Sequence, residues 1–103
     1  MKLITKEIEK ILEKNPLYST DGQGDKAKVL VKFFNPVGAG TWLVTEGQKE
    51  GSDWLFFGKA KIDCWELGYF RLSELQNVNL PFGMSIERDL YLDKNATLES
   101  EAK

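Results

Sequence analysis

The chain has 103 residues, of which 42% are hydrophobic, 12% aromatic and 29% charged, and its formal net charge is −2. This length and composition predict one folded domain with a core of its own and exclude a disordered chain. Sixteen acidic residues against fourteen basic ones give no overall attraction to phosphate backbones or anionic membranes. General nucleic-acid binding is therefore less favoured, and no membrane binding is expected.

The chain has no histidine and a single cysteine, Cys64. This composition excludes an internal disulfide, Ser-His and Cys-His catalytic pairs, and zinc sites. Asp63 and Glu66 flank Cys64, and their negative charges disfavour a reactive thiolate. We therefore expect no enzymatic activity, no cofactor and no metal. No apolar signal segment or membrane-spanning run is present, which predicts a protein of the reducing cytoplasm.

An amphipathic helix is predicted at the amino terminus. Its apolar side chains fall within an arc of about 100° at 3.6 residues per turn. They are Ile4, Ile8, Ile11 and Leu12. Thr5 is placed to cap the start, and Asn15-Pro16 ends the helix. Such a helix is expected to cover one face of a sheet.

Three strands of an antiparallel meander are predicted next, over residues 28–34, 41–46 and 53–62. Short polar turns join them. In the third strand Trp54 and Phe56 share the face that we expect to point into the core. Gly58 interrupts this strand, where a bulge or the close approach of another backbone is expected.

The rest of the chain completes an α+β fold. A short helix over 73–78, capped by Ser73, and a last alternating strand over 84–92 are predicted. The expected architecture is a twisted antiparallel sheet of four or five strands with one N-terminal amphipathic helix and one short helix. Residues 1–93 are expected to form a single globular domain, and residues 94–103 a polar, frayed C-terminal tail.

The central strands are apolar on both faces, and this raises the question of what covers the second face. One helix of about ten residues is roughly 15 Å long and covers one face only. The second face would hold Leu30, Phe34, Leu43, Leu55 and Phe57. Either residues 67–82 fold over it or a partner does. We favour the first, because monomers rarely leave large apolar patches exposed.

A glycine-bearing loop, Asp21-Gly22-Gln23-Gly24-Asp25, contains the alternating oxygens of a calcium or phosphate loop. An EF-hand that began at Asp21 would need glycine where Lys26 stands and glutamate where Lys32 stands. The Gly-Lys-Ser/Thr of a P-loop is also absent. The loop is therefore predicted to be structural or to contact a partner.

Carboxylates gather on loops and on the expected outer strand faces. The candidates for partner binding are Asp21, Asp25, Glu87 and Asp89; further acidic residues of this kind are Glu46, Glu50 and Asp53. Aromatic residues that we expect to be exposed lie between them in the sequence, namely Tyr18, Trp65, Tyr69 and Tyr91. An acidic, aromatic surface suits a basic groove on another protein. The alternative is an ordinary solvated surface.

Several short motifs follow one another in order along the chain, from about Leu3 to Asp93. They are Pro16-Leu17-Tyr18, Asp21-Gly22-Gln23-Gly24-Asp25, Val31-Lys32-Phe33-Phe34, Thr41-Trp42, Thr45-Glu46-Gly47, Phe56-Phe57-Gly58, Glu66-Leu67-Gly68-Tyr69-Phe70 and Glu87-Arg88-Asp89-Leu90. This ordered set resembles an uncharacterised bacterial family, domain of unknown function 2958, carried by plasmids, phages and gut bacteria. A small stand-alone protein of this kind is also similar to an anti-CRISPR inhibitor of type II RNA-guided nucleases. The family has no established catalytic motif, so no residue takes a role from it.

Two functions therefore remain open. The resemblance implies a small mobile-element-encoded protein that binds and inhibits a host RNA-guided defence nuclease through an acidic surface. The alternative is a nucleic-acid-binding accessory protein of a plasmid or phage, with aromatic rings stacked on bases beside lysines. Its residues would be Trp42, Trp54, Phe56 or Tyr69 with Lys28, Lys32, Lys59 and Lys61. An acidic main surface would favour the first function, and a lysine stripe beside exposed aromatics the second.

Overall fold

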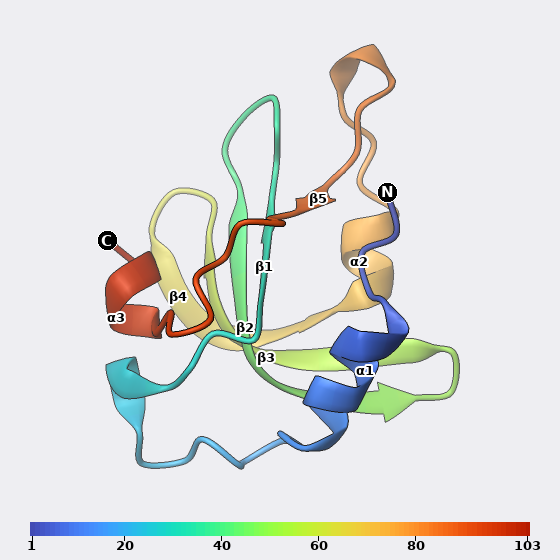
Figure 1. Cartoon of the computed structure of the whole chain (residues 1–103). Helices are drawn as coiled ribbons and strands as arrows, with labels where there is room; N and C mark the ends of the chain where they lie inside the picture. Colours follow the sequence, from blue (N-terminus) through green and yellow to red (C-terminus); the bar gives the residue numbers. More distant parts are fainter.

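A computed structural model describes all residues, 1–103, and has an α+β fold, as predicted. Its five strands form one antiparallel sheet in the order β4-β3-β2-β1-β5 (Figure 1). The elements in chain order are α1 (Lys6–Glu13), the 3₁₀ turn η1 (Gly24–Lys26), β1 (Val31–Phe34), β2 (Thr41–Glu50), β3 (Asp53–Lys61), β4 (Trp65–Arg71), α2 (Leu72–Gln76), the 3₁₀ turn η2 (Pro81–Gly83), β5 (Glu87–Arg88) and α3 (Leu98–Glu101). None of the helices has the length and the apolar character that a membrane-spanning helix needs.

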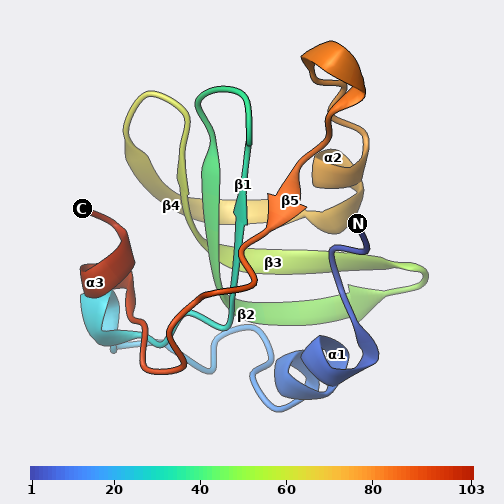
Figure 2. The ribbon, with the colours of Figure 1, turned by 45° about the horizontal axis from the view of Figure 1, so that its top comes forward.

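The two longest strands, β2 and β3, bend sharply in their middle (Figures 1 and 2). The register between them shifts between Val44 and Glu46, so β2 has an extra residue at this point. Gly58, on β3, lies opposite Val44 of β2. A Cβ atom on Gly58 would lie 1.8 Å from the backbone oxygen of Leu43, so only glycine fits. The predicted close approach at Gly58 is confirmed.

The main core lies on the sheet face that α1 and α2 cover. Trp54 and Phe56 are buried there, as predicted, with their rings nearly parallel and 6.5 Å apart. Leu12 of α1 and Leu75 of α2 belong to the same buried cluster. The Thr5 hydroxyl accepts the N–H of Ile8 at 3.2 Å, which confirms the predicted helix cap.

Helix α2 begins at Leu72 and not at the predicted cap, Ser73. Ser73 instead bonds to Asp53, because its hydroxyl donates to Oδ2 at 2.7 Å and its N–H donates to Oδ1 at 3.0 Å. Glu74 accepts the backbone N–H of Arg71 at 3.2 Å, and this contact closes the first turn of the helix. The Ser73 side chain therefore ties α2 to the start of β3.

Part of the second sheet face is covered, and from a direction that the sequence pattern did not predict. Leu43 is buried there, whereas Phe34, Leu55 and Phe57 are half-buried. Leu30, expected on this face, packs against the main core instead.

A small buried cluster lies on the second face, made of Ala27, Val29, Leu43, Ala96 and Leu98. Val29 donates its N–H to Ala96 O at 2.9 Å, and Leu98 donates its N–H to Ala27 O at 3.0 Å. The cover therefore comes from residues 27–29 and 96–98. The expectation that residues 67–82 fold over this face is wrong, since they form β4, α2 and the chain that follows.

The last ten residues are part of the fold and not a frayed tail. Thr97 caps α3 by accepting the N–H of Ser100 at 3.2 Å. Glu101 on this helix pairs with Lys32 of β1 at 3.0 Å. The segment folds because Ala96 and Leu98, two apolar residues in a polar stretch, bury themselves beside Leu43.

The predicted strand over 84–92 is much shorter than expected, since only Glu87 and Arg88 pair, with Phe34 and Phe33 of β1. The Asp89 carboxylate accepts the N–H of Tyr91 at 2.8 Å and turns the chain out of the sheet. Tyr91 is consequently 93% exposed. Local hydrogen bonding by an aspartate has replaced the strand that the alternating pattern predicted.

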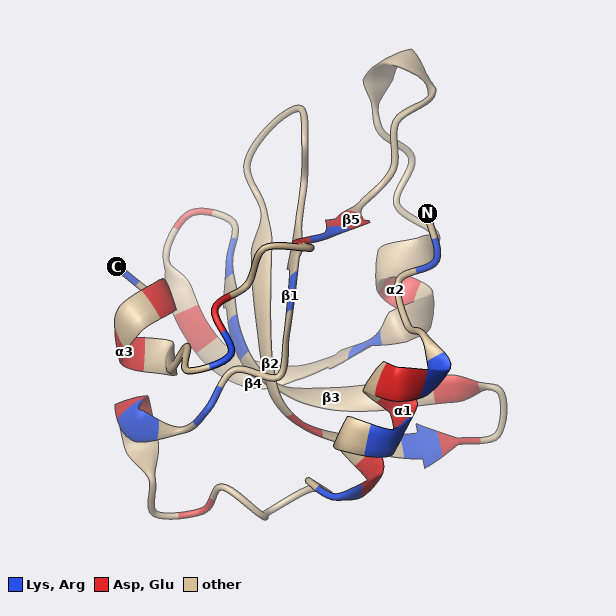
Figure 3. Cartoon of the chain, viewed as in Figure 1, with Lys and Arg blue, Asp and Glu red and all other residues tan.

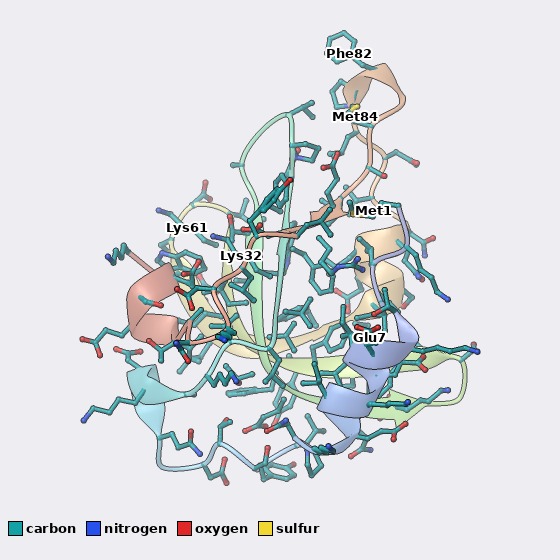
Figure 4. The ribbon with its side chains drawn as sticks, viewed as in Figure 1. Met1, Glu7, Lys32, Lys61, Phe82 and Met84 are labelled. Atoms are coloured by element: carbon teal, nitrogen blue, oxygen red, sulfur yellow. The ribbon has the colours of Figure 1, made fainter.

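Between α2 and β5 the chain forms a protruding loop with η2 at its end. Phe82 lies at the tip and points away from the rest of the molecule (Figure 4). Its φ of 63° is left-handed, a conformation that bulky residues rarely adopt. Pro81-Phe82-Gly83 therefore interrupts the regular secondary structure between α2 and β5, as predicted.

Candidate functional site

The four predicted acidic residues lie in two separate places. Asp21 and Asp25 are on the loop between α1 and β1, where Asp25 pairs with Lys59 of β3 at 2.9 Å. Glu87 is on β5, and Asp89 follows it directly. Because β2 and β1 lie between β3 and β5 in the sheet, the two pairs do not form one continuous acidic patch.

Asp21 and Asp25 are exposed, whereas Glu87 and Asp89 are half-buried. Arg88, between the second pair, donates to the backbone oxygen of Leu3 at 2.9 Å. Basic and acidic residues are interleaved along most elements (Figure 3). Among the four predicted carboxylates, those of the 21–25 loop are therefore the most exposed.

This loop is held by a residue that sequence reasoning placed on the polar surface, Glu46. Only 2% of Glu46 is exposed. Its carboxylate accepts the N–H of Tyr18 at 2.7 Å, the N–H of Thr20 at 2.8 Å and the hydroxyl of Thr20. Three donors compensate the carboxylate for its lost hydration. The expectation of an exposed Glu46 is wrong, because it is a buried anchor.

The bulge in β2 explains why Glu46 is buried beneath the loop. In a regular strand Glu46 would share a face with Trp42 and Val44. The register shift places Glu46 opposite Phe57 instead. The Thr45 hydroxyl donates to Phe57 O at 3.2 Å and stabilises the shifted arrangement. In the sequence this contact is marked only by the Thr45-Glu46-Gly47 motif. The alternation of side chains along a regular strand does not indicate that Glu46 lies on the other face.

Two tyrosines border the anchored loop. Tyr18 is 66% exposed and Tyr69, on β4, is 52% exposed. The rings of Tyr69 and Phe57 lie 5.0 Å apart. Partial removal from water, a hydrogen bond with Tyr18 and the negative charges of Glu46 and Asp21 raise the pKa of Tyr69. The raised pKa lets Tyr69 keep its phenolic proton to a higher pH than an ordinary tyrosine.

Tyr18 has a left-handed backbone, with a φ of 75°. Its N–H bond to Glu46 holds this unfavourable conformation, which costs roughly 1–2 kcal/mol for a residue with a Cβ. Tyr18 and Phe82 are the two residues other than glycine with positive φ, and both are exposed aromatics. Neither side chain serves the core, so each is available for contact with another molecule.

A small cavity lies under the loop, with a volume of about 210 Å³. Its apolar walls are Ala27, Phe57, Leu67 and Leu98; its polar walls are Thr20, Asp21, Gly22, Gly24, Asp25 and Thr45. Several segments whose motifs carried the family resemblance thus meet at one place. They are the segments around Tyr18, Asp21 to Asp25, Glu46, Phe57 and Tyr69.

A larger apolar groove, of about 490 Å³, lies between α1, the start of β1 and residues 88–94. Ile8, Ile11, Leu90 and Leu92 line it, and Asp89 lies at its wall. Asp89 is therefore placed beside an apolar groove and not on an acidic patch.

No group of three or more histidine, cysteine or acidic side chains is arranged to hold a metal ion. Cys64 is exposed, and its thiol lies 3.6 Å from a Glu66 carboxylate oxygen.

The aromatic platform of the nucleic-acid alternative is not assembled. Trp54 and Phe56 are buried in the core and are not accessible to a base. Lys59 is engaged by Asp25. Lys61 lies over the ring of Trp65, 5.8 Å from its centroid. Of the four aromatics named for stacking, Tyr69 alone is largely exposed.

Comparison with known proteins identifies the family of the chain but no individual relative. No curated protein and no solved structure matches the chain. The family described as "Protein of unknown function (DUF2958)" matches residues 3–103. The match covers nearly the whole chain, α3 included. The chain therefore belongs to the DUF2958 family.

Proposed function

We propose that this protein works by binding a basic protein partner through the loop that Glu46 anchors, and that it catalyses no reaction. The partner we propose is a host RNA-guided defence nuclease of type II, which the protein inhibits on behalf of a plasmid or phage. This function requires both proteins to meet in the cytoplasm.

The observation that carries this proposal is the buried Glu46 carboxylate with its bonds to Tyr18 and Thr20. A surface loop needs no buried anion merely to connect a helix to a strand. Here the anion fixes the loop so that Asp21, Asp25 and Tyr18 are presented in one conformation. A preorganised surface loses less conformational entropy on binding than a flexible one.

The chemistry of the presented groups favours a partner that normally holds nucleic acid. Such a protein offers lysines and arginines to phosphate groups, so a competitor must supply negative charge. Asp21 and Asp25 supply that charge, and the exposed rings of Tyr18 and Tyr69 supply apolar contact area beside it. Interface hot spots are enriched in tryptophan, tyrosine and arginine.

Charge reversal tests this proposal in a DNA-cleavage assay with the purified nuclease. We expect the parent to inhibit cleavage and the double variant Asp21→Lys with Asp25→Lys to lose inhibition. The matched control reverses two exposed carboxylates on α1, Glu7→Lys with Glu13→Lys, and should inhibit like the parent. Equal inhibition by the loop variant and the parent would exclude this loop as the contact.

Glu87 and Asp89 remain a separate predicted contact, and a second double variant, Glu87→Lys with Asp89→Lys, tests them in the same assay. A parent that never inhibits but retards single-stranded DNA in a gel would replace the inhibitor with the nucleic-acid alternative. In that case the retardation should be lost when Lys59 and Lys61 are mutated.

A further inference from the structure

The cavity under the 20–25 loop combines two kinds of wall. Phe57, Leu67 and Leu98 provide apolar surface from β3, β4 and α3. Asp21 and Asp25 provide carboxylates from the loop above them. Gly22 and Gly24 have left-handed backbones, with φ of 82° and 56°, and a Cβ atom on either would meet no neighbour within 4 Å. The loop therefore curves over the cavity without filling it.

The negative charge at this cavity exceeds the positive charge that the chain itself supplies. Asp25 uses Oδ1 for its 2.9 Å contact with the Lys59 ammonium, and Oδ2 has no partner. Asp21 takes part in none of the three ion pairs of the protein. Of the two carboxylates only Asp25 is paired with a lysine, so a further cation would find free acceptor oxygens at the cavity.

We propose that this cavity binds the side chain of an arginine or a lysine from the partner protein. Both side chains have an aliphatic stem, which suits the walls formed by Phe57 and Leu67, and a cationic end, which suits Asp21 and Asp25. A bare metal ion would need a third acidic ligand, which is not present. An anionic ligand would be repelled. This inference rests on the proposed function, because it states which partner group the same site receives.

Because Lys59 pairs with Asp25, one substitution should strengthen cation binding and another should weaken it. Lys59 occupies one of the carboxylates that an incoming cation would use, so it competes with the partner side chain. Lys59→Met keeps the apolar stem, removes the competitor and should strengthen cation binding. Asp25→Asn removes the acceptor charge and should weaken binding. Lys61→Met, two residues further along β3, is the matched control and should change nothing.

The probe is N-acetyl-arginine methylamide, titrated into the whole protein and followed through the backbone amide resonances of Gly22 and Gly24. A single side chain should saturate with a dissociation constant on the order of 1–10 mM. The lysine analogue should bind at the same place, and the uncharged norleucine analogue should not. Lys59→Met should lower the dissociation constant about threefold and Asp25→Asn should raise it by a similar factor, the size expected of an exposed ion pair.

Absence of saturable shifts with both cationic probes overturns the inference, as does unchanged binding in Asp25→Asn that folds like the parent. Equal binding of the norleucine analogue also overturns it, because the cavity would then be merely apolar. Failure of the proposed function looks different. A parent that binds the probes at Gly22 and Gly24 but leaves the nuclease active keeps the cation site and requires another basic partner.

Discussion

The carboxylate of Glu46 on β2 accepts the backbone N–H of Tyr18, 28 residues earlier in the chain, at 2.7 Å. This contact joins the loop after α1 to the bulge in the middle of the sheet. The loop can present Asp21 and Tyr18 in a fixed conformation only while this buried anion is in place.

Replacing Glu46 with glutamine should destabilise the protein, because the new amide group is a donor where a carboxylate oxygen accepted. At least one of the N–H groups of Tyr18 and Thr20 then loses its acceptor. We expect a loss of about 1–3 kcal/mol in the free energy of unfolding, measured by urea denaturation.

The control is Glu50→Gln on the same strand, which removes a more exposed ion pair with Arg71 and should cost less than about 1 kcal/mol. A Glu46→Gln loss no larger than that of the control would show that Glu46 does not anchor the loop.

Gly58→Ala should be severely destabilising. The added Cβ would lie 1.8 Å from the backbone oxygen of Leu43, and two adjacent strands would have to separate. We expect a loss of at least about 3 kcal/mol by denaturant melting.

Gly68 of β4 provides a close comparison, because it pairs with Gly58 of the neighbouring strand β3. A Cβ atom on Gly68 would meet no other atom within 4 Å. Gly68→Ala should leave stability unchanged or raise it by up to about 1 kcal/mol. Similar effects from the two substitutions would contradict the close approach of β2 to Gly58.

Trp54→Ala should lower the free energy of unfolding by about 3–5 kcal/mol, because it leaves a large cavity between α1, α2 and the sheet. Trp65→Ala, on half-buried Trp65 of β4, should cost clearly less. A Trp54→Ala loss below about 1 kcal/mol would mean that the ring points outward and that the β3 register is wrong by one residue.

The pKa of Asp53 is lowered from its ordinary value of 3.8, first by the hydrogen bond from the Ser73 hydroxyl and also by the N–H groups of Trp54 and Ser73. Burial opposes this shift without cancelling it. A carboxyl whose pKa is lower in the folded state stabilises the fold above pH 3.8, and this contribution is lost as the pH falls through the folded-state pKa.

Asp53→Asn should therefore be less stable than the parent at neutral pH, and the difference should shrink as the pH falls below 3.8. Urea denaturation of both proteins at about pH 7 and about pH 3 measures this difference. A difference that is the same at both pH values would contradict the role of the Asp53 charge.

Much of the fold follows from local sequence patterns. Helix α1 with its Thr5 cap, the β1–β2 turn and the burial of Trp54 were predictable because each depends on residues close together in the chain. The strand near Glu87 was predicted too long, since alternation of polar and apolar residues does not reveal that Asp89 will bond to the N–H of Tyr91.

The anchor of the candidate site could not be predicted in this way. One extra residue in β2 moves Glu46 to the other face of the sheet, and strand periodicity assumes that no such residue exists. The folding of the last ten residues was missed for a different reason. Ala96 and Leu98 bury themselves against Leu43, more than fifty positions away, and their own neighbourhood is polar.

If the loop held by Glu46 binds a basic nuclease, as proposed, the parent should associate with the purified type II nuclease and its guide RNA. Association is measured for the immobilised parent and for the immobilised double variant Asp21→Lys with Asp25→Lys. Both proteins should be measured at about 0.05 M and about 0.5 M salt. We predict that the parent binds, that high salt slows its association, and that charge reversal in the loop abolishes binding at both salt concentrations. Equal association rates for the two proteins, unaffected by salt, would contradict the claim.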